Sequence, residues 1–66
     1  MSKETTRATI IREGARLIHK KGYHATGLSD ILTAARVPKG SFYFYFKSKE
    51  DFGLAVIDHY AEAIAA

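Results

Sequence analysis

Residues 28–46, with the sequence LSDILTAARVPKGSFYFYF, decide the fold of this 66-residue chain. The first part of this stretch has apolar residues at the spacing of one helical face, namely Leu28, Ile31, Leu32 and Ala35. Pro38 then interrupts the pattern, because proline pushes the residue before it out of the helical region and is itself tolerated where a new helix begins. About three residues therefore turn the chain between two helices, and this spacing predicts a helix-turn-helix.

The second part of the stretch contains five consecutive aromatic residues, 42–46. A strand would tolerate such a run, but the sequence offers no second strand to pair with it, and an isolated strand is not stable. As a helix, the run places Phe42 and Phe46 on one face, which we expect to be buried. Tyr43, Phe44 and Tyr45 point elsewhere, so some aromatic surface is expected to be exposed.

Two longer helices are predicted on either side of this unit. The first runs from about Thr6 to Lys21 and contains Gly14, which costs about 1 kcal/mol relative to alanine and so indicates the close approach of another helix. The last begins at Ser48, with Asp51 reaching back in a capping box. Its apolar side consists of Phe52, Ala55, Val56, Tyr60, Ala63 and Ile64. Tyr23 is expected in the core beside the first helix, and the predicted fold class is all-α.

Charge is distributed unevenly along the chain. Residues 1–49 hold all ten Lys and Arg against three acids, a balance of +7, whereas residues 50–66 hold four acids and no Lys or Arg, a balance of −4, which gives the net +3. A basic segment joined to an acidic one indicates a face that meets a polyanion. A solvated helical surface with scattered charges fits the distribution equally well.

The composition excludes several classes of protein. The chain has no cysteine, which excludes disulfides, thiolate zinc sites and a redox thiol. No apolar run approaches the roughly 20 residues that span a bilayer, and the N-terminus lacks a signal-peptide pattern, so we expect a cytoplasmic chain without a membrane partner. His19, His24 and His59 do not have the spacing of a helical zinc site, and no catalytic motif is present. We therefore expect neither an enzyme nor a cofactor or metal.

The chain resembles the N-terminal DNA-binding domain of TetR-type transcriptional repressors. The resemblance covers residues 6–66 and rests on short motifs: Gly22-Tyr23, Ala25-Thr26, Asp30-Ile31, Lys39-Gly40-Ser41, Tyr43, Phe46 and Lys49-Glu50. It implies a three-helix homeodomain-like bundle with its helix-turn-helix at about residues 27–46, followed by the start of a fourth, connecting helix. We expect the family's C-terminal ligand-binding and dimerisation domain to lie outside this chain.

The resemblance also implies a function, namely sequence-specific DNA binding by a ligand-responsive repressor. Its partners would be double-stranded DNA with a palindromic operator, a second copy joined through the missing domain, and a small-molecule inducer bound outside this chain. The chain departs from the family at four places. The family usually has Ser or Thr at Gly27, Ala at Gly14 and Gly at Arg36, and it often has His near residues 44 and 45.

In a helix-turn-helix the second helix enters the major groove. There Lys39 can donate a hydrogen bond to guanine, and Ser41 can form a hydrogen bond with either base of a pair. Gly40 lets the backbone approach a phosphate. The rings of Tyr43, Phe44 and Tyr45 can meet thymine methyl groups. Lys49 resembles the family's phosphate-contacting lysine, and the secondary phosphate contacts are predicted at Thr26, Ser29 and Arg7. Lys39 and Lys49 are both predicted at helix N-termini, where the dipole disfavours cations, and this indicates a polyanion partner.

One alternative from another class stays open. The chain could be a small helical protein-interaction module that docks a partner through its aromatic run. Such a module would not need Lys39-Gly40-Ser41 at a helix start together with Lys49. Retention on heparin or nonspecific DNA at low salt would separate the two functions, because only a DNA-binding domain requires it.

Overall fold

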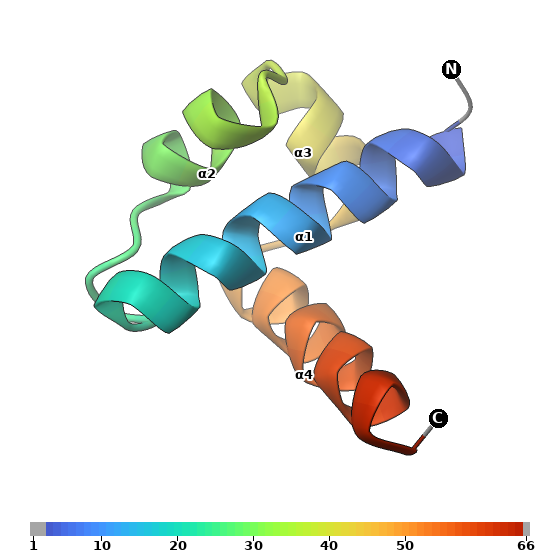
Figure 1. The fold of residues 1–66 in the computed structure, drawn as a ribbon. Coiled ribbons are helices and arrows are strands. Elements are labelled where there is room, and N and C mark those ends of the chain that lie inside the picture. Colours follow the sequence, from blue (N-terminus) through green and yellow to red (C-terminus); the bar gives the residue numbers. More distant parts are fainter. Residues whose placement is uncertain (1–2, 66) are drawn as a thin grey trace.

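The computed structural model describes residues 3–65, with side chains for residues 5–62 and 64. It contains the helices α1 (Lys3–Lys21), α2 (Leu28–Ala35), α3 (Lys39–Tyr45) and α4 (Lys49–Ala65). Figure 1 shows α1 crossing the molecule, with α2 and α3 on one side of it and α4 on the other. Residues 3–65 contain no strand, so the all-α prediction is confirmed, including for the aromatic run. No helix in this part of the chain is long and apolar enough to cross a membrane.

The core gathers side chains from all four helices around three phenylalanine rings. The ring centroids of Phe42 and Phe46 lie 5.3 Å apart. The ring centroid of Phe52 lies 5.7 Å from that of Phe42 and 5.4 Å from that of Phe46. These rings are 0–2% exposed, as predicted for Phe42 and Phe46. Replacing one of them by alanine would cost about 3–5 kcal/mol. The other buried apolar residues are Ile10, Ile11, Ala15, Ile31, Ala35 and Val56.

Gly14 is the point at which α1 meets α4. A Cβ atom at this position would overlap the ring of Phe52, so no larger residue fits without a shift. The predicted close approach of another helix is therefore confirmed, and Phe52 is the side chain that occupies the space. The helical glycine is explained by this contact.

Burial is lower than predicted along the apolar side of α4 and at Tyr23. Tyr60 is 42% exposed, and its hydroxyl donates a 3.4 Å hydrogen bond to the carbonyl of Ala15, while Ile64 is 86% exposed. Ala63 lies outside the residues whose side chains are described. Tyr23, expected in the core, is half-buried at the edge of α4. Only the first two turns of α4 reach the core, because α1 and α4 cross and then diverge (Figure 1).

The connections before and after α2 are fixed by local hydrogen bonds. Gly27 is the N-cap, and its amide donates to Oδ2 of Asp30 at 3.0 Å. At the other end Arg36 adopts the left-handed conformation, with φ 58° and ψ 45°, and its amide donates to the carbonyls of Leu32 and Thr33. A residue without a Cβ adopts this conformation at no steric cost, which accounts for the glycine that the resembled family usually has here.

The starts of α3 and α4 differ slightly from the expected caps. Pro38 is the N-cap of α3 with extended φ and ψ (−75° and 161°), so Lys39 is the first helical residue. At α4 the amide of Asp51 donates to the Ser48 hydroxyl at 3.1 Å, as in a capping box. The Asp51 carboxylate accepts from the amide of Lys47, one residue earlier than predicted, at 3.0 Å. Lys39 and Lys49 therefore begin their helices, as the sequence predicts.

Candidate nucleic-acid interface

The buried face of α3 determines which of its residues face outward. Phe42 and the C-cap Phe46 hold the helix against the core, and Tyr45 is half-buried against the same cluster. Tyr43 is 46% exposed and Phe44 is 63% exposed. An interface on α3 therefore has an aromatic surface, together with Lys39 and Gly40, which are also exposed.

Lys39 and Tyr43 lie one turn apart on the exposed side of α3. The ammonium nitrogen of Lys39 is 6.0 Å from the centroid of the Tyr43 ring, at the limit of a cation–π contact. Ser41 is half-buried on the neighbouring face. The predicted set on α3 is thus brought together on one short helix, although Tyr45 and Ser41 present less of their side chains than Lys39, Tyr43 and Phe44.

Gly40 differs from the glycines that the packing requires. A Cβ at Gly53 would lie 2.9 Å from Cε1 of Tyr23, and one at Gly14 would overlap Phe52. A Cβ at Gly40, in contrast, would have no atom from another part of the described chain within 4 Å. A glycine inside a helix costs about 0.5–1 kcal/mol relative to alanine. The fold of this chain gives no reason for the missing side chain.

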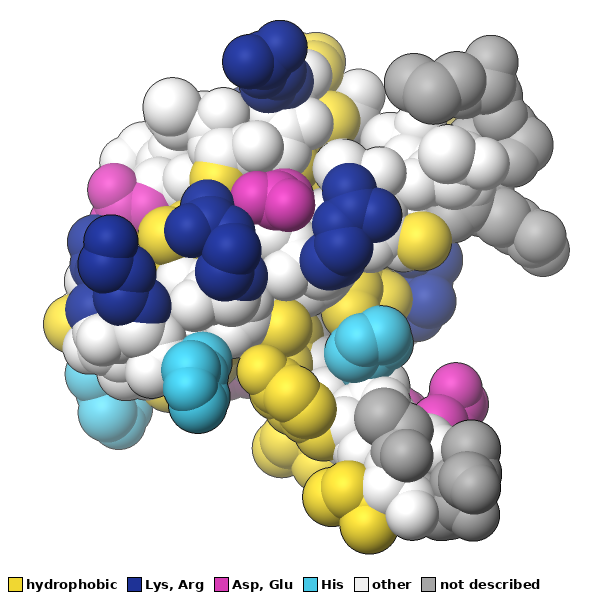
Figure 2. All heavy atoms as spheres, viewed as in Figure 1, with side chains coloured by type: hydrophobic (Ala, Val, Ile, Leu, Met, Phe, Trp, Pro, Cys, Tyr) yellow, Lys and Arg dark blue, Asp and Glu magenta, His cyan; other side chains and the backbone are white. Residues whose placement is uncertain are grey.

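The surface around the helix-turn-helix is positively charged. Residues 31–49 contain four basic residues and no acid, a balance of +4: Arg36, Lys39, Lys47 and Lys49. Of these, only Lys49 is not exposed. Figure 2 shows Lys and Arg side chains over α1 and the α2 side of the molecule, whereas hydrophobic side chains gather toward α4. The cations of residues 31–49 suit an anionic partner at the helix-turn-helix.

The ammonium group of the half-buried Lys49 is bound to the backbone of the domain. Its Nζ donates a 2.9 Å hydrogen bond to the carbonyl of Tyr23 and lies 4.5 Å from the centroid of the Tyr23 ring. An ammonium has three N–H donors, so this bond leaves capacity for a further acceptor. The sequence predicts a phosphate contact for this lysine and does not reveal its bond to Tyr23, which lies 26 residues earlier.

The three secondary phosphate contacts are placed differently from one another. Thr26 is 0% exposed, and its hydroxyl donates to the carbonyl of Gly22 at 2.7 Å, so its side chain is not available to a phosphate. The predicted phosphate contact of the Thr26 side chain is therefore corrected. Ser29 is exposed in the first turn of α2. Arg7 is exposed on α1, with its guanidinium 5.3 Å from the Phe46 ring centroid and hence close to the end of α3.

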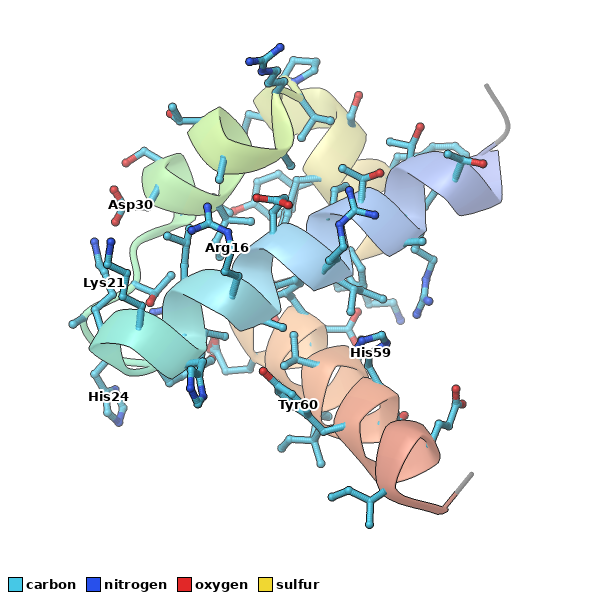
Figure 3. The ribbon with its side chains drawn as sticks, in the orientation of Figure 1. Arg16, Lys21, His24, Asp30, His59 and Tyr60 are labelled. Carbon is cyan, nitrogen blue, oxygen red and sulfur yellow. The ribbon has the colours of Figure 1, made fainter. Side chains whose placement is uncertain are left out.

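Asp30 joins the end of α1 to the start of α2. Its Oδ2 accepts the Gly27 amide at 3.0 Å and lies 3.2 Å from the ammonium of Lys21. Figure 3 shows the Lys21 and Asp30 side chains directed toward each other. The hydrogen bond from Gly27, followed by the contact with Lys21, lowers the pKa of the Asp30 carboxyl. The sequence places Asp30 in a first helical turn, but it does not reveal that this carboxylate accepts the amide of the N-cap residue Gly27.

A second surface feature is an apolar groove between the end of α1 and α4. Its volume is about 490 Å³, and its lining is almost entirely apolar, with Ile18, Tyr23, Leu54, Ile57 and Tyr60 among its residues. Leu54 and Ile57 are each 64% exposed. Tyr60 projects from α4 in Figure 3. The groove lies on α4, away from the exposed side of α3, and the sequence pattern does not reveal it.

No three His, Asp or Glu side chains among the described residues could together hold a metal ion. His24 and His59 lie on different parts of the molecule in Figure 3, one after α1 and one on α4.

Comparison with known proteins identifies the family. Residues 10–56 match the model of the bacterial regulatory proteins of the tetR family, and the match covers more than half of the chain. The chain belongs to the TetR family. The resemblance inferred from the motifs is thereby confirmed, and the helix-turn-helix is the DNA-binding domain of a family of transcriptional regulators, not of enzymes.

Curated TetR-family relatives are similar over most of this chain. The transcriptional regulator AcuR of Cereibacter sphaeroides is 56% identical over 52 residues, which cover 79% of this chain and 24% of AcuR. The repressor NemR of Escherichia coli is 48% identical over 65 residues, which cover 92% of this chain and 33% of NemR. The chain thus spans about a quarter to a third of the length of these relatives.

Solved TetR-family structures share the fold. The reduced form of E. coli NemR superposes with a TM-score of 0.89 at 43% identity, over 91% of this chain and 31% of the NemR chain. A TetR regulatory protein from Rhodobacter sphaeroides superposes with a TM-score of 0.84 at 52% identity, over 88% of this chain and 31% of that chain. The arrangement of α1 to α4 is therefore that of the TetR-family DNA-binding domain.

Proposed function

We propose that this chain reads the sequence of double-stranded DNA through α3, as the DNA-binding domain of a ligand-responsive repressor. The family supplies the general activity, and the exposed side of α3 supports the particular surface. Lys39, Gly40, Tyr43 and Phe44 are exposed there on a segment with a balance of +4. A helix of this kind fits the major groove, with its N-terminal residues toward the base edges.

Gly40 carries the proposal. Glycine in a helix is unfavourable, and no packing within the described chain requires it at this position. Close approach of an outside surface does require it, since a side chain at the second residue of α3 would separate the helix from the DNA. Lys39 and Ser41 on either side supply donors at the same level. The missing side chain and its polar neighbours together fit a DNA backbone or base edge.

Each remaining residue has a role that follows from its chemistry and position. Lys39 donates to O6 or N7 of a guanine, and Ser41 to either partner of a base pair. The Tyr43 hydroxyl reaches a phosphate, and the rings of Phe44 and Tyr45 meet base edges. Lys49, Ser29 and Arg7 contact phosphates, which fixes the register and supplies salt-dependent affinity without reading sequence.

The substitution Gly40→Ala tests the proposal, because it separates folding from binding. Alanine at this position should raise the free energy of unfolding by about 0.5–1 kcal/mol, since it favours the helix and meets no neighbour. It should at the same time weaken the affinity for DNA. The measurements are urea unfolding and fluorescence anisotropy with a labelled duplex at low salt.

Ala61→Gly is the matched control for this experiment. Ala61 is exposed on α4, so the reverse change there should lower stability by a similar amount and leave the DNA affinity of the folded protein unchanged. Unchanged affinity in Gly40→Ala would contradict the proposed contact. A chain retained on neither heparin nor random DNA would instead favour the protein-interaction module.

The partners of the whole protein follow from its family. Joined through a dimerisation domain of the kind that the family has, two copies would place their α3 helices about 34 Å apart on a palindromic operator in the cytoplasm. An inducer bound outside residues 1–66 would change this spacing by tilting α4, which meets α1 where Phe52 packs on Gly14. This chain alone should be monomeric in sedimentation experiments, and a tight dimer would contradict the assignment of dimerisation to another domain.

A further inference from the structure

A shallow hollow lies on the exposed side of α3. Its volume is about 340 Å³, and it is lined by Gly40, Ser41, Phe44 and Tyr45. Gly40 and Phe44 are one helical turn apart, as are Ser41 and Tyr45, so the four residues form two neighbouring pairs on the helix surface. A Cβ added at Gly40 would have no neighbour within 4 Å, so the position of the missing side chain is open space in this hollow.

Of the aromatic residues on α3, Phe44 has the chemistry that suits an apolar group. Its side chain has no polar atom and is 63% exposed, the largest exposed fraction among them. Tyr43 carries a hydroxyl and lies near the Lys39 ammonium, which suits a phosphate better, and Tyr45 is half-buried on the core. The Tyr45 ring stands at 86° to the Phe44 ring with centroids 5.0 Å apart. This contact braces the Phe44 ring at the edge of the hollow.

We propose that this hollow binds the 5-methyl group of a pyrimidine in the major groove, with the Phe44 ring as the contacting surface. The inference rests on the proposed function, because it requires α3 to lie in that groove. Among the unmodified bases only thymine carries a methyl group there, and the other groups on the groove edge are hydrogen-bond donors or acceptors. A phenylalanine offers nothing to those polar groups, so Phe44 would specify thymine at one position in each half-site.

The charge around the hollow supports a nucleic-acid ligand over an apolar peptide. Residues 31–49 have a balance of +4, and Lys39 is exposed next to Gly40. An apolar side chain from a protein partner would gain nothing from this charge, whereas a methyl group on DNA is surrounded by phosphates. The apolar hollow and its cationic surroundings are thus explained by the same partner.

The experiment begins by selecting duplexes that bind this chain from a random pool. In the best duplex each thymine is then replaced, one at a time, by deoxyuridine, which removes the methyl group and keeps every hydrogen-bonding atom. At one position in the half-site the affinity should fall about 4-fold, the value expected for one buried methyl group. The same measurement with Phe44→Ala should give a thymine-to-uracil affinity ratio of about 1 at that position.

Leu54→Ala is the matched control, because Leu54 is 64% exposed but lies on α4 in the separate groove. This variant should keep the 4-fold ratio. A ratio near 1 at every thymine in the unmodified chain, with selective binding intact, would overturn this inference and leave the proposed function standing. A 4-fold ratio that survives in Phe44→Ala would overturn the assignment to Phe44. Absence of any selective binding would overturn the proposed function and this inference with it.

Discussion

The ammonium nitrogen of Lys49 lies 2.9 Å from the carbonyl oxygen of Tyr23 and 4.5 Å from the centroid of the Tyr23 ring. The same carbonyl accepts the amide of Thr26 at 3.2 Å, and the Tyr23 ring lies against Gly53. The first residue of α4 is thus joined to the connection between α1 and α2. A phosphate contact at Lys49 would therefore act on a residue that also holds two parts of the fold together.

Lys49→Ala should affect stability and DNA binding at once. Loss of the bond to Tyr23 should lower the free energy of unfolding by about 1 kcal/mol. Loss of a phosphate contact should weaken binding to selected and random duplexes by the same factor, and should reduce the slope of log affinity against log salt by about 1. Lys20→Ala removes the same charge from an exposed position on α1. It should change neither the free energy of unfolding nor the salt slope of DNA binding. A lower stability with an unchanged salt slope would mean that Lys49 only holds Tyr23.

Asp30→Ala should reveal a stability contribution that depends on pH. The pKa of Asp30 is lowered in the folded chain by the Gly27 amide and by Lys21, so the ionised form favours folding. This contribution is present above the unfolded pKa of about 3.9 and is lost as the pH falls through the folded value. Urea unfolding should therefore show wild type more stable than the variant at pH 7, with the difference shrinking in acid.

Asp30→Asn provides the control for this measurement. Asparagine keeps an acceptor for the Gly27 amide but does not ionise, so this variant should lose less stability at pH 7 than Asp30→Ala. Relative to Asp30→Ala, its stability should not change between neutral and acid pH. A difference between wild type and Asp30→Ala that stays constant from pH 7 to pH 3 would contradict the role of the ionised carboxylate.

Arg36→Gly should stabilise the chain. Arg36 occupies the left-handed region at φ 58°, where a residue with a Cβ loses about 1–2 kcal/mol. Glycine removes that cost but gains freedom in the unfolded chain, so the net increase in the free energy of unfolding should be about 0.5–1 kcal/mol. Arg36→Ala removes the same side chain, keeps the Cβ and should give no increase. Equal stability of the two variants would show that the backbone at residue 36 is unstrained.

The local pattern of the sequence was sufficient to predict the helix-turn-helix and its anchors. Proline between two apolar helical patterns defined the turn, and the spacing of Phe42 and Phe46 defined the buried face, because both depend on residues close in the chain. Gly14 was predicted to allow a close contact, although its partner Phe52 could not be named from the pattern.

Features that depend on distant residues or on backbone angles were not predictable in this way. Thr26 was expected at the surface but is buried, because the backbone turns at Gly22, where φ is 89°, and the Thr26 hydroxyl donates to the Gly22 carbonyl. On α4 the pattern predicted an apolar side that includes Phe52 and Val56, and both are buried, but it did not reveal that Tyr60 and Ile64, farther along the same side, would be exposed. The bond from Lys49 to Tyr23 depends on how the start of α4 and the connection between α1 and α2 are placed in space.

Reading of DNA sequence by α3 is tested most directly by comparing the affinities of wild type and Lys39→Ala for a selected duplex and a random one. Lys39 begins α3 with its side chain exposed, where we propose that it meets a base edge. The substitution should cost about 1–3 kcal/mol on the selected duplex, much less on random DNA, and should relax the preference at one base pair. An equal loss of affinity on both duplexes would contradict sequence reading by this residue and reduce it to a phosphate contact.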